Sequence, residues 1–85
     1  MNTSLQIAIC EDIPADAELL VSHITESGIA SQHETFSSGE ALLAAFVPGK
    51  YDLIFLDIYM GGIKGVDAAA QIRGADRTVT LAFTT

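Results

Sequence analysis

Short apolar runs alternate along the chain with stretches whose apolar residues recur at helical spacing. The runs at residues 5–10, 51–57 and 78–85 predict strands, since they are rich in residues that favour extended structure. A more polar run at residues 32–36 predicts a strand at an edge of the sheet. The run ending in Asp57 is the most apolar, which is typical of a strand covered on both faces in a parallel sheet.

Three helices are expected between these runs. The first begins at Pro14, with Asp12 as its expected cap, and ends at Gly28. The second begins after Ser37 or Ser38, and the third covers residues 65–73. The apolar faces are expected to comprise Leu19, Leu20, His23 and Ile24 in the first, Leu42, Leu43 and Phe46 in the second, and Val66, Ala69, Ala70 and Ile72 in the third.

The resulting order, βαβαβαβ, predicts an α/β fold with a parallel sheet and right-handed crossovers. A flavodoxin-like, doubly wound sheet with strand order 2-1-3-4 places the first and third strands side by side. A chain of 85 residues has room for one small domain, so residues 1–85 are expected to form a single unit.

Composition narrows the class of protein. A hydrophobic share of 49% with 18% charged residues indicates a folded chain. No apolar stretch approaches the roughly 20 residues of a membrane span, and the start lacks the basic region of a signal peptide. The single cysteine, Cys10, is expected to be buried and the protein cytoplasmic. A net charge of −7 argues against nucleic-acid binding by this segment.

Acidic residues follow two of the predicted strands. Glu11 and Asp12 come after the first, and Asp57 ends the third. Because the carboxyl ends of adjacent parallel strands meet at one edge, we expect these three side chains to lie close together. Taken alone, Asp57 would equally well cap the following turn. Clustered carboxylates repel one another, and either protonation of one member or a bound Mg²⁺ would offset the repulsion.

This arrangement resembles the CheY-like receiver domain of a two-component response regulator. The marks are the acidic pair after the first strand, Asp57 after the third, Met60 three residues later, Gly65 eight residues later, and a strand that ends in threonine. The segment around Asp57 is also similar to regulators whose output is a LytTR-type DNA-binding domain.

The resemblance implies that Asp57 accepts a phosphoryl group from a histidine kinase and that a conformational switch then regulates an output such as transcription. It implies a hydroxyl contact to the phosphoryl group from Thr85, with Thr84 as second choice. The Mg²⁺ ligands that it implies are Glu11, Asp12, Asp57 and the backbone carbonyl of Tyr59.

Two departures from the family pattern stand out. The family usually has proline where this chain has Gly61, so a looser loop is expected. The fifth strand, the lysine that follows it and the last two helices are absent from these residues, and Lys64 cannot be assumed to replace that lysine. The chain is therefore expected to be the N-terminal part of a receiver domain. The apolar run at residues 79–83 would then leave an open sheet edge, which favours a homodimer or a strand-exchanged oligomer.

Two other functions fit parts of the pattern. One is a receiver-like interaction domain that is never phosphorylated, which the missing lysine favours. The other is a phosphatase or hydrolase that uses an aspartyl-phosphate, but such enzymes usually have a second acid two residues after the aspartate, and position 59 is Tyr. Nucleotide binding is disfavoured, since no G-x-G-x-x-G follows the first strand.

Overall fold

The computed structural model describes residues 4–29 and 31–84. Within them, strands and helices alternate as the hydrophobic pattern predicts. The elements are β1 (Leu5–Cys10), α1 (Pro14–Glu26), β2 (Ser31–Phe36), α2 (Gly39–Ala45), β3 (Leu53–Asp57), α3 (Gly65–Ala75) and β4 (Thr80–Thr84).

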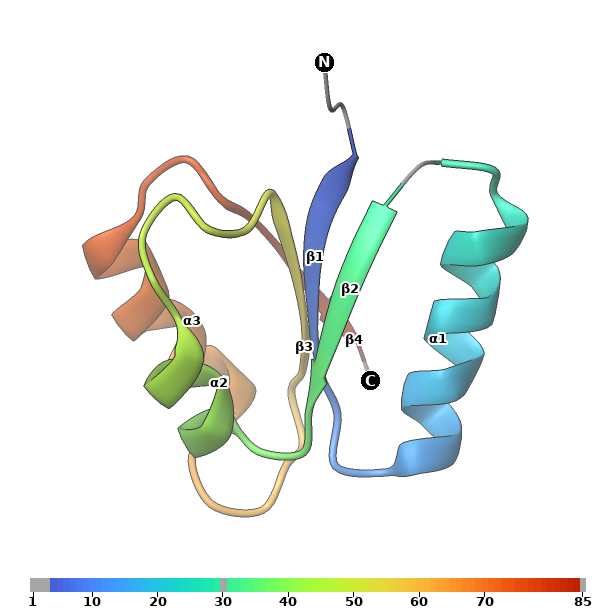
Figure 1. Cartoon of the computed structure of the whole chain (residues 1–85). Helices are drawn as coiled ribbons and strands as arrows, with labels where there is room; N and C mark the ends of the chain where they lie inside the picture. The colour runs from blue at the N-terminus through green and yellow to red at the C-terminus, as the bar shows by residue number, and fades with distance from the viewer. Residues whose placement is uncertain (1–3, 30, 85) are drawn as a thin grey trace.

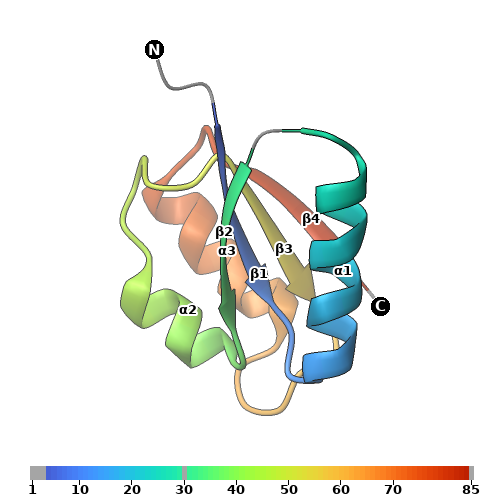
Figure 2. The same ribbon diagram turned by 45° about the vertical axis from the view of Figure 1, so that its right-hand side comes forward.

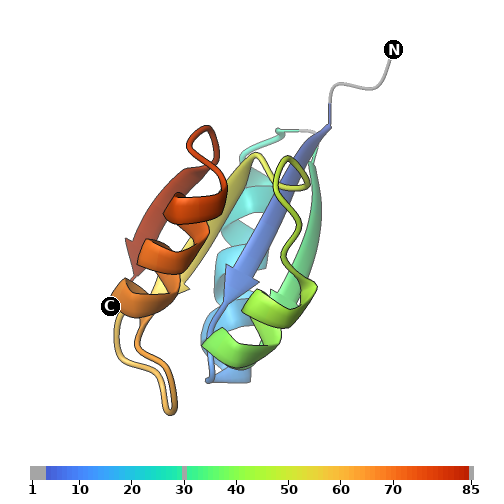
Figure 3. The same cartoon turned by 90° about the vertical axis from the view of Figure 1, so that its left-hand side faces the viewer.

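The four strands form one parallel sheet in the order β2-β1-β3-β4, which confirms the predicted topology. Ile7 of β1 pairs with Leu53 of β3, and the register runs on to Cys10 opposite Leu56. β1 and β3 are therefore neighbours over their whole shared length, and both point toward the same edge (Figure 1). α1 covers one face of the sheet, whereas α2 and α3 cover the other (Figures 1 and 3).

Strand residues alternate between two hydrophobic cores, as strand geometry requires. The larger core lies between the sheet and α2 and α3, and it includes Ala8, Cys10, Leu42, Ile54, Leu56, Met60, Ala68 and Ile72. The smaller core lies under α1 and consists of Ile7, Ile9 and Ala17, with Leu20, Val21, Ile24, Leu53 and Phe55 packed around them. The sheet is thus covered on both faces (Figure 2).

Two helices are rotated relative to the predicted faces. In α1, Ala17 is buried, whereas Leu19 is 56% exposed and His23 is exposed. In α3, Ala68, Ala69 and Ile72 are buried, whereas Val66 and Ala70 are exposed. At about 100° per residue, a buried face set by positions i, i+3, i+4 and i+7 excludes positions i+1, i+2, i+5 and i+6. The predictions of Leu19, His23, Val66 and Ala70 as apolar-face residues were therefore wrong.

Helix ends also differ in part from the prediction. Ser38 caps α2 as expected, since its Oγ accepts the Ala41 N–H at 3.0 Å. Asp12 does not cap α1: the cap position is Ile13, whose N–H is accepted by Glu11 Oε2 at 3.2 Å. Asp12 instead points across to the loop after β3, where its Oδ2 lies 3.4 Å from the Gly61 N–H. The side chain is thus available to a site at that edge.

α3 continues past Gly74, which does not end it, and stops before Asp76. Asp76 is buried and accepts hydrogen bonds from the Gly49, Thr78 and Val79 backbone amides and from the Thr78 hydroxyl. The hydrogen bond from the Gly49 amide, followed by those from the amide and the hydroxyl of Thr78, lowers the pKa of Asp76 to about 2. This turn delays the start of β4 to Thr80, two residues after the predicted start.

The start of α3 packs directly against the end of β3. A Cβ on Gly65 would overlap the backbone carbonyl oxygen of Asp57, closer than real Cβ atoms approach. Gly74, in the same helix, would meet nothing within 4 Å. We expect Gly65→Ala to lower the free energy of unfolding by about 1–3 kcal/mol, as overpacking does.

The matched substitution Gly74→Ala should be neutral or stabilising by up to about 1 kcal/mol, because alanine has the higher helix propensity. Urea unfolding of both variants measures the difference. Equal stabilities would contradict the close approach of α3 to Asp57.

Candidate functional site

The carboxyl edge of the sheet brings three acidic side chains together. One carboxylate oxygen from each of Glu11, Asp12 and Asp57 lies within 4.8 Å of the others. Asp57 is buried, with 6% of its surface exposed, whereas Glu11 is partly exposed and Asp12 is exposed. The adjacency of β1 and β3 therefore produces the convergence that the sequence predicted. Solvent therefore reaches the group from the side of Asp12, whereas Asp57 lies on its buried side.

Crowding changes the protonation of this group. The pKa of Glu11 is raised from 4.5 to about 7, first by burial and then by its hydrogen bond to Asp57. The Ile13 N–H opposes that shift, but less strongly than burial raises it. In the absence of a cation, Glu11 therefore keeps its proton to a higher pH than an ordinary glutamate does. A hard divalent cation would take the place of that proton, because carboxylate oxygens are the ligands that Mg²⁺ prefers.

Asp57 is fixed by the backbone that follows it. Its Oδ1 accepts the Tyr59 N–H at 3.0 Å, so the side chain does stabilise the next turn. A carboxylate has about four acceptor positions, so this single bond leaves the group able to bind a cation or react. Asp57 can therefore both cap the following turn and contribute to the site, although the sequence presented these roles as alternatives.

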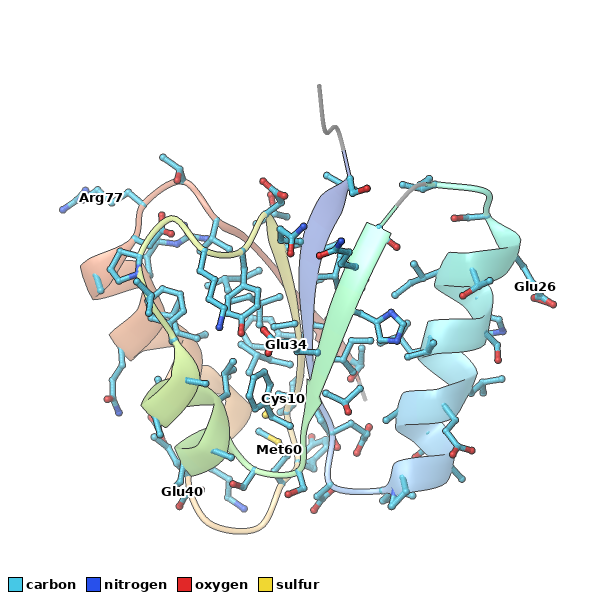
Figure 4. All side chains as sticks on the ribbon, viewed as in Figure 1. Cys10, Glu26, Glu34, Glu40, Met60 and Arg77 are labelled. Atoms are coloured by element: carbon cyan, nitrogen blue, oxygen red, sulfur yellow. The ribbon has the colours of Figure 1, made fainter. Side chains whose placement is uncertain are left out.

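The loop after β3 is anchored beneath the site by sulfur atoms. Met60 is 2% exposed, and its Sδ lies 3.4 Å from Cys10 Sγ (Figure 4). Cys10 is buried as predicted, and burial, followed by the charge of Asp57, raises its pKa to about 11. The thiol therefore stays protonated and unreactive. The side chain of Tyr59 is 73% exposed, whereas its backbone N–H bonds Asp57.

Lys64 folds back on its own loop. Its Nζ lies 3.5 Å from the Met60 carbonyl oxygen. The structure thus places the Lys64 ammonium against the backbone of its own loop.

Of the two candidates for the switch hydroxyl, Thr84 and Thr85, only Thr84 lies within the described residues. Thr84 pairs with Asp57 across β3 and β4, and its carbonyl accepts the Ile58 N–H at 3.1 Å. With Glu11 and Phe55, it helps line a cavity of about 230 Å³ between α1 and the sheet. Thr85, the first choice for the switch residue, lies outside the described residues.

One residue that contacts the loop was not predicted. Glu40, in the first turn of α2, accepts the Ile63 N–H at 3.1 Å. A glutamate at the second position of a helix fits dipole stabilisation equally well, so the sequence alone does not reveal this contact.

The family model for the response regulator receiver domain matches residues 7–85. The chain belongs to this family. A receiver domain is a signalling switch rather than a conventional enzyme, and its matched part includes all three carboxylates and β4.

Relatives agree with this assignment. The chain is 32% identical over 71 residues to the transcriptional regulatory protein TcrA of Mycobacterium tuberculosis, covering 84% of this chain and 27% of TcrA. It is 35% identical to the response regulator protein TrrA of Thermotoga maritima, solved in complex with Mg²⁺ and BeF, with a TM-score of 0.81. That match covers 91% of this chain and 65% of TrrA.

A second structure contains TrrA with the histidine kinase ThkA. The chain is 34% identical to the matched chain, with a TM-score of 0.81 and coverage of 93% and 66%. This chain thus spans about a quarter of TcrA and about two thirds of the matched structures. Within the described residues, no helix is long and apolar enough to cross a membrane.

The raised pKa of Glu11 predicts how stability depends on pH. Because the folded value, about 7, exceeds the ordinary 4.5, the folded state holds more protons between these values. The free energy of unfolding should therefore fall as pH rises from about 4.5 to about 7 in chelator. Urea unfolding across this range measures the slope.

Glu11→Gln is the control, because it removes the titrating group while keeping its size. This variant should lose the fall in stability over that range. A wild-type protein that becomes more stable across it would contradict the electrostatic account of the site.

Proposed function

We propose that this receiver domain accepts a phosphoryl group on Asp57 from a histidine kinase. The observation that carries the proposal is the convergence of Glu11, Asp12 and Asp57 within 4.8 Å at the sheet edge. The proposed Mg²⁺ ligands are these three carboxylates and the backbone carbonyl of Tyr59. The complex of TrrA with ThkA supports a kinase as partner, and the complex of TrrA with Mg²⁺ and BeF supports the metal.

In the proposed transfer, an oxygen of the Asp57 carboxylate attacks phosphorus. The bond between phosphorus and the kinase imidazole nitrogen breaks, and its electron pair stays on that nitrogen. Bound Mg²⁺ supplies positive charge that offsets the negative charge of both the carboxylate and the phosphoryl group. Glu11 and Asp12 would bind the Mg²⁺ ion, while the hydrogen bond from the Tyr59 N–H fixes the rotamer of Asp57.

The output side of the proposal runs through β4. The Ile58 N–H bonds the Thr84 carbonyl, so a change at the residue after Asp57 reaches β4 directly. We assign the switch hydroxyl to Thr85, with Thr84 as second choice. The similarity to TcrA, a transcriptional regulatory protein, supports transcription as the regulated output. With a net charge of −7, DNA contact is assigned to a part of the protein other than this segment.

A receiver-like interaction domain that is never phosphorylated is the second candidate. The observation that favours it is the position of Lys64, whose Nζ lies 3.5 Å from a carbonyl of its own loop. If no basic side chain neutralises the phosphoryl group, Asp57 could remain unmodified while the surface still binds partners.

Phosphorylation distinguishes the two candidates. After incubation with Mg²⁺ and a small phospho-donor, intact-mass measurement should show the gain of one phosphoryl group. Asp57→Asn should abolish this gain, and Asp12→Ala should weaken Mg²⁺ binding in calorimetry. The control is Asp52→Asn: it lies just before β3, and its Oδ2 accepts the Gln6 N–H, a bond that an amide oxygen preserves.

The expected result for Asp52→Asn is phosphorylation like that of the wild type. A folded wild-type chain that binds Mg²⁺ but gains no mass would favour the unphosphorylated interaction domain. Unchanged Mg²⁺ affinity in Asp12→Ala would remove Asp12 from the ligand set.

We also propose that a chain of these 85 residues self-associates through β4. Among the described residues β4 pairs with β3 alone, and its Phe83 is 47% exposed. Open apolar edges pair with other chains. Light scattering should therefore show a mass that rises with concentration and that falls again in Phe83→Lys.

Val47→Lys is the control, since Val47 is an equally exposed apolar residue (55%) outside the strands. It should leave association unchanged. A clean monomer at high concentration would contradict this proposal.

A further inference from the structure

The start of α2 lies against the loop that joins β3 to α3. Ser38 caps the helix, and Gly39 and Glu40 form its first turn. Glu40 Oε2 accepts the Ile63 N–H at 3.1 Å. Figure 4 shows Glu40 at this end of α2, beside the loop. A carboxylate from one element therefore bonds the backbone of another, 23 residues later in the chain.

Two glycines make room for this contact. A Cβ on Gly39 would overlap Ile63 Cγ2, closer than real Cβ atoms approach. A Cβ on Gly62 would lie 2.5 and 2.8 Å from the two carboxylate oxygens of Glu40. Gly62 also has φ +73°, a conformation that favours glycine. The helix start and the loop thus fit together only because neither glycine carries a side chain.

The same loop is attached to the acidic site at its other end. The Tyr59 N–H bonds Asp57, and the Gly61 N–H lies 3.4 Å from Asp12 Oδ2. Between Tyr59 and Ile63 the chain includes two consecutive glycines, Gly61 and Gly62, which leave the backbone conformationally free. Contacts therefore set the conformation of the loop. Within the loop, Lys64 Nζ lies 3.5 Å from the Met60 carbonyl oxygen, and from outside it Glu40 bonds the Ile63 N–H.

We propose that Glu40 is a positioning residue for the phosphoryl-acceptor site. By bonding the Ile63 N–H, it fixes the path of the loop and hence the backbone of Tyr59, which the proposed function places beside Mg²⁺. Glu40 itself binds neither metal nor phosphoryl group. This inference rests on the proposed function and adds a residue from α2 to the site.

The test compares Glu40→Ala with Glu40→Gln. Both remove the negative charge, but glutamine keeps a side-chain oxygen that can accept the Ile63 N–H. Hydrogen exchange at the Ile63 amide should accelerate in Glu40→Ala and stay near the wild-type rate in Glu40→Gln. Calorimetric Mg²⁺ affinity should fall about fivefold in Glu40→Ala, the value of one typical hydrogen bond, and by less than about twofold in Glu40→Gln.

Glu26→Ala controls for the lost charge, since Glu26 ends α1 on the far side of the molecule (Figure 4). It should leave both readouts unchanged. If the two Glu40 variants lose Mg²⁺ affinity equally, charge alone explains the effect and the inference is overturned. If Glu40→Ala keeps the wild-type affinity or Ile63 exchange, it is overturned as well.

Two further measurements keep the test decisive. Should Glu40→Ala fail to fold, Gly62→Ala tests the same contact, because the new Cβ would displace the Glu40 carboxylate. Gly49→Ala is its control, since it introduces alanine at a similar φ (+84°) where the Cβ would meet nothing within 4 Å. Only Gly62→Ala should lower Mg²⁺ affinity, and equal affinity in both variants overturns the inference. A wild-type chain that binds no Mg²⁺ overturns the proposed function instead, and Ile63 exchange still shows whether Glu40 holds the loop.

Discussion

Mutual repulsion among three carboxylates is the constraint on which the functional edge of this protein depends. The parallel pairing of β1 with β3 forces Glu11 and Asp12 toward Asp57, and the apolar cores on both faces of the sheet keep those strands in place. Stable packing thus gathers the carboxylates at one edge, and the pKa of Glu11 is raised there first by burial and then by its contact with Asp57. A fold that concentrates like charges in this way is prepared for a cation before any cation binds.

The backbone around Asp57 limits how that cost can be relieved. Gly65 brings α3 against the carbonyl of Asp57, and Thr84 bonds the amide of the next residue. Met60 packs on Cys10 below. These contacts leave little freedom for Asp57 to move away from Glu11, so a change of charge at the carboxylate is more easily accommodated in the loop and β4 than in β3. This is the physical basis on which a local modification could alter a distant surface.

Much of this could be predicted from the sequence, since it follows from simple periodicities. The long apolar run before Asp57 indicated a buried parallel strand. The βαβ order predicted a doubly wound sheet, and in the flavodoxin-like form of that sheet the first and third strands are neighbours. Helix phase was less predictable: Leu19 and Val66 are as apolar as the residues that are buried, and only packing against the sheet decides between them. The contact of Glu40 with Ile63 was not predictable, because it joins two segments whose relative position depends on the whole fold.

The cysteine beneath the acidic edge has a practical consequence. Cys10 is 1% exposed at the end of a central strand, and its protonated sulfur lies against Met60. An alkylating reagent can therefore reach it only when β1 separates from its neighbours. Since the sequence contains one cysteine, its rate of labelling would report the opening of the domain's centre without any engineered probe.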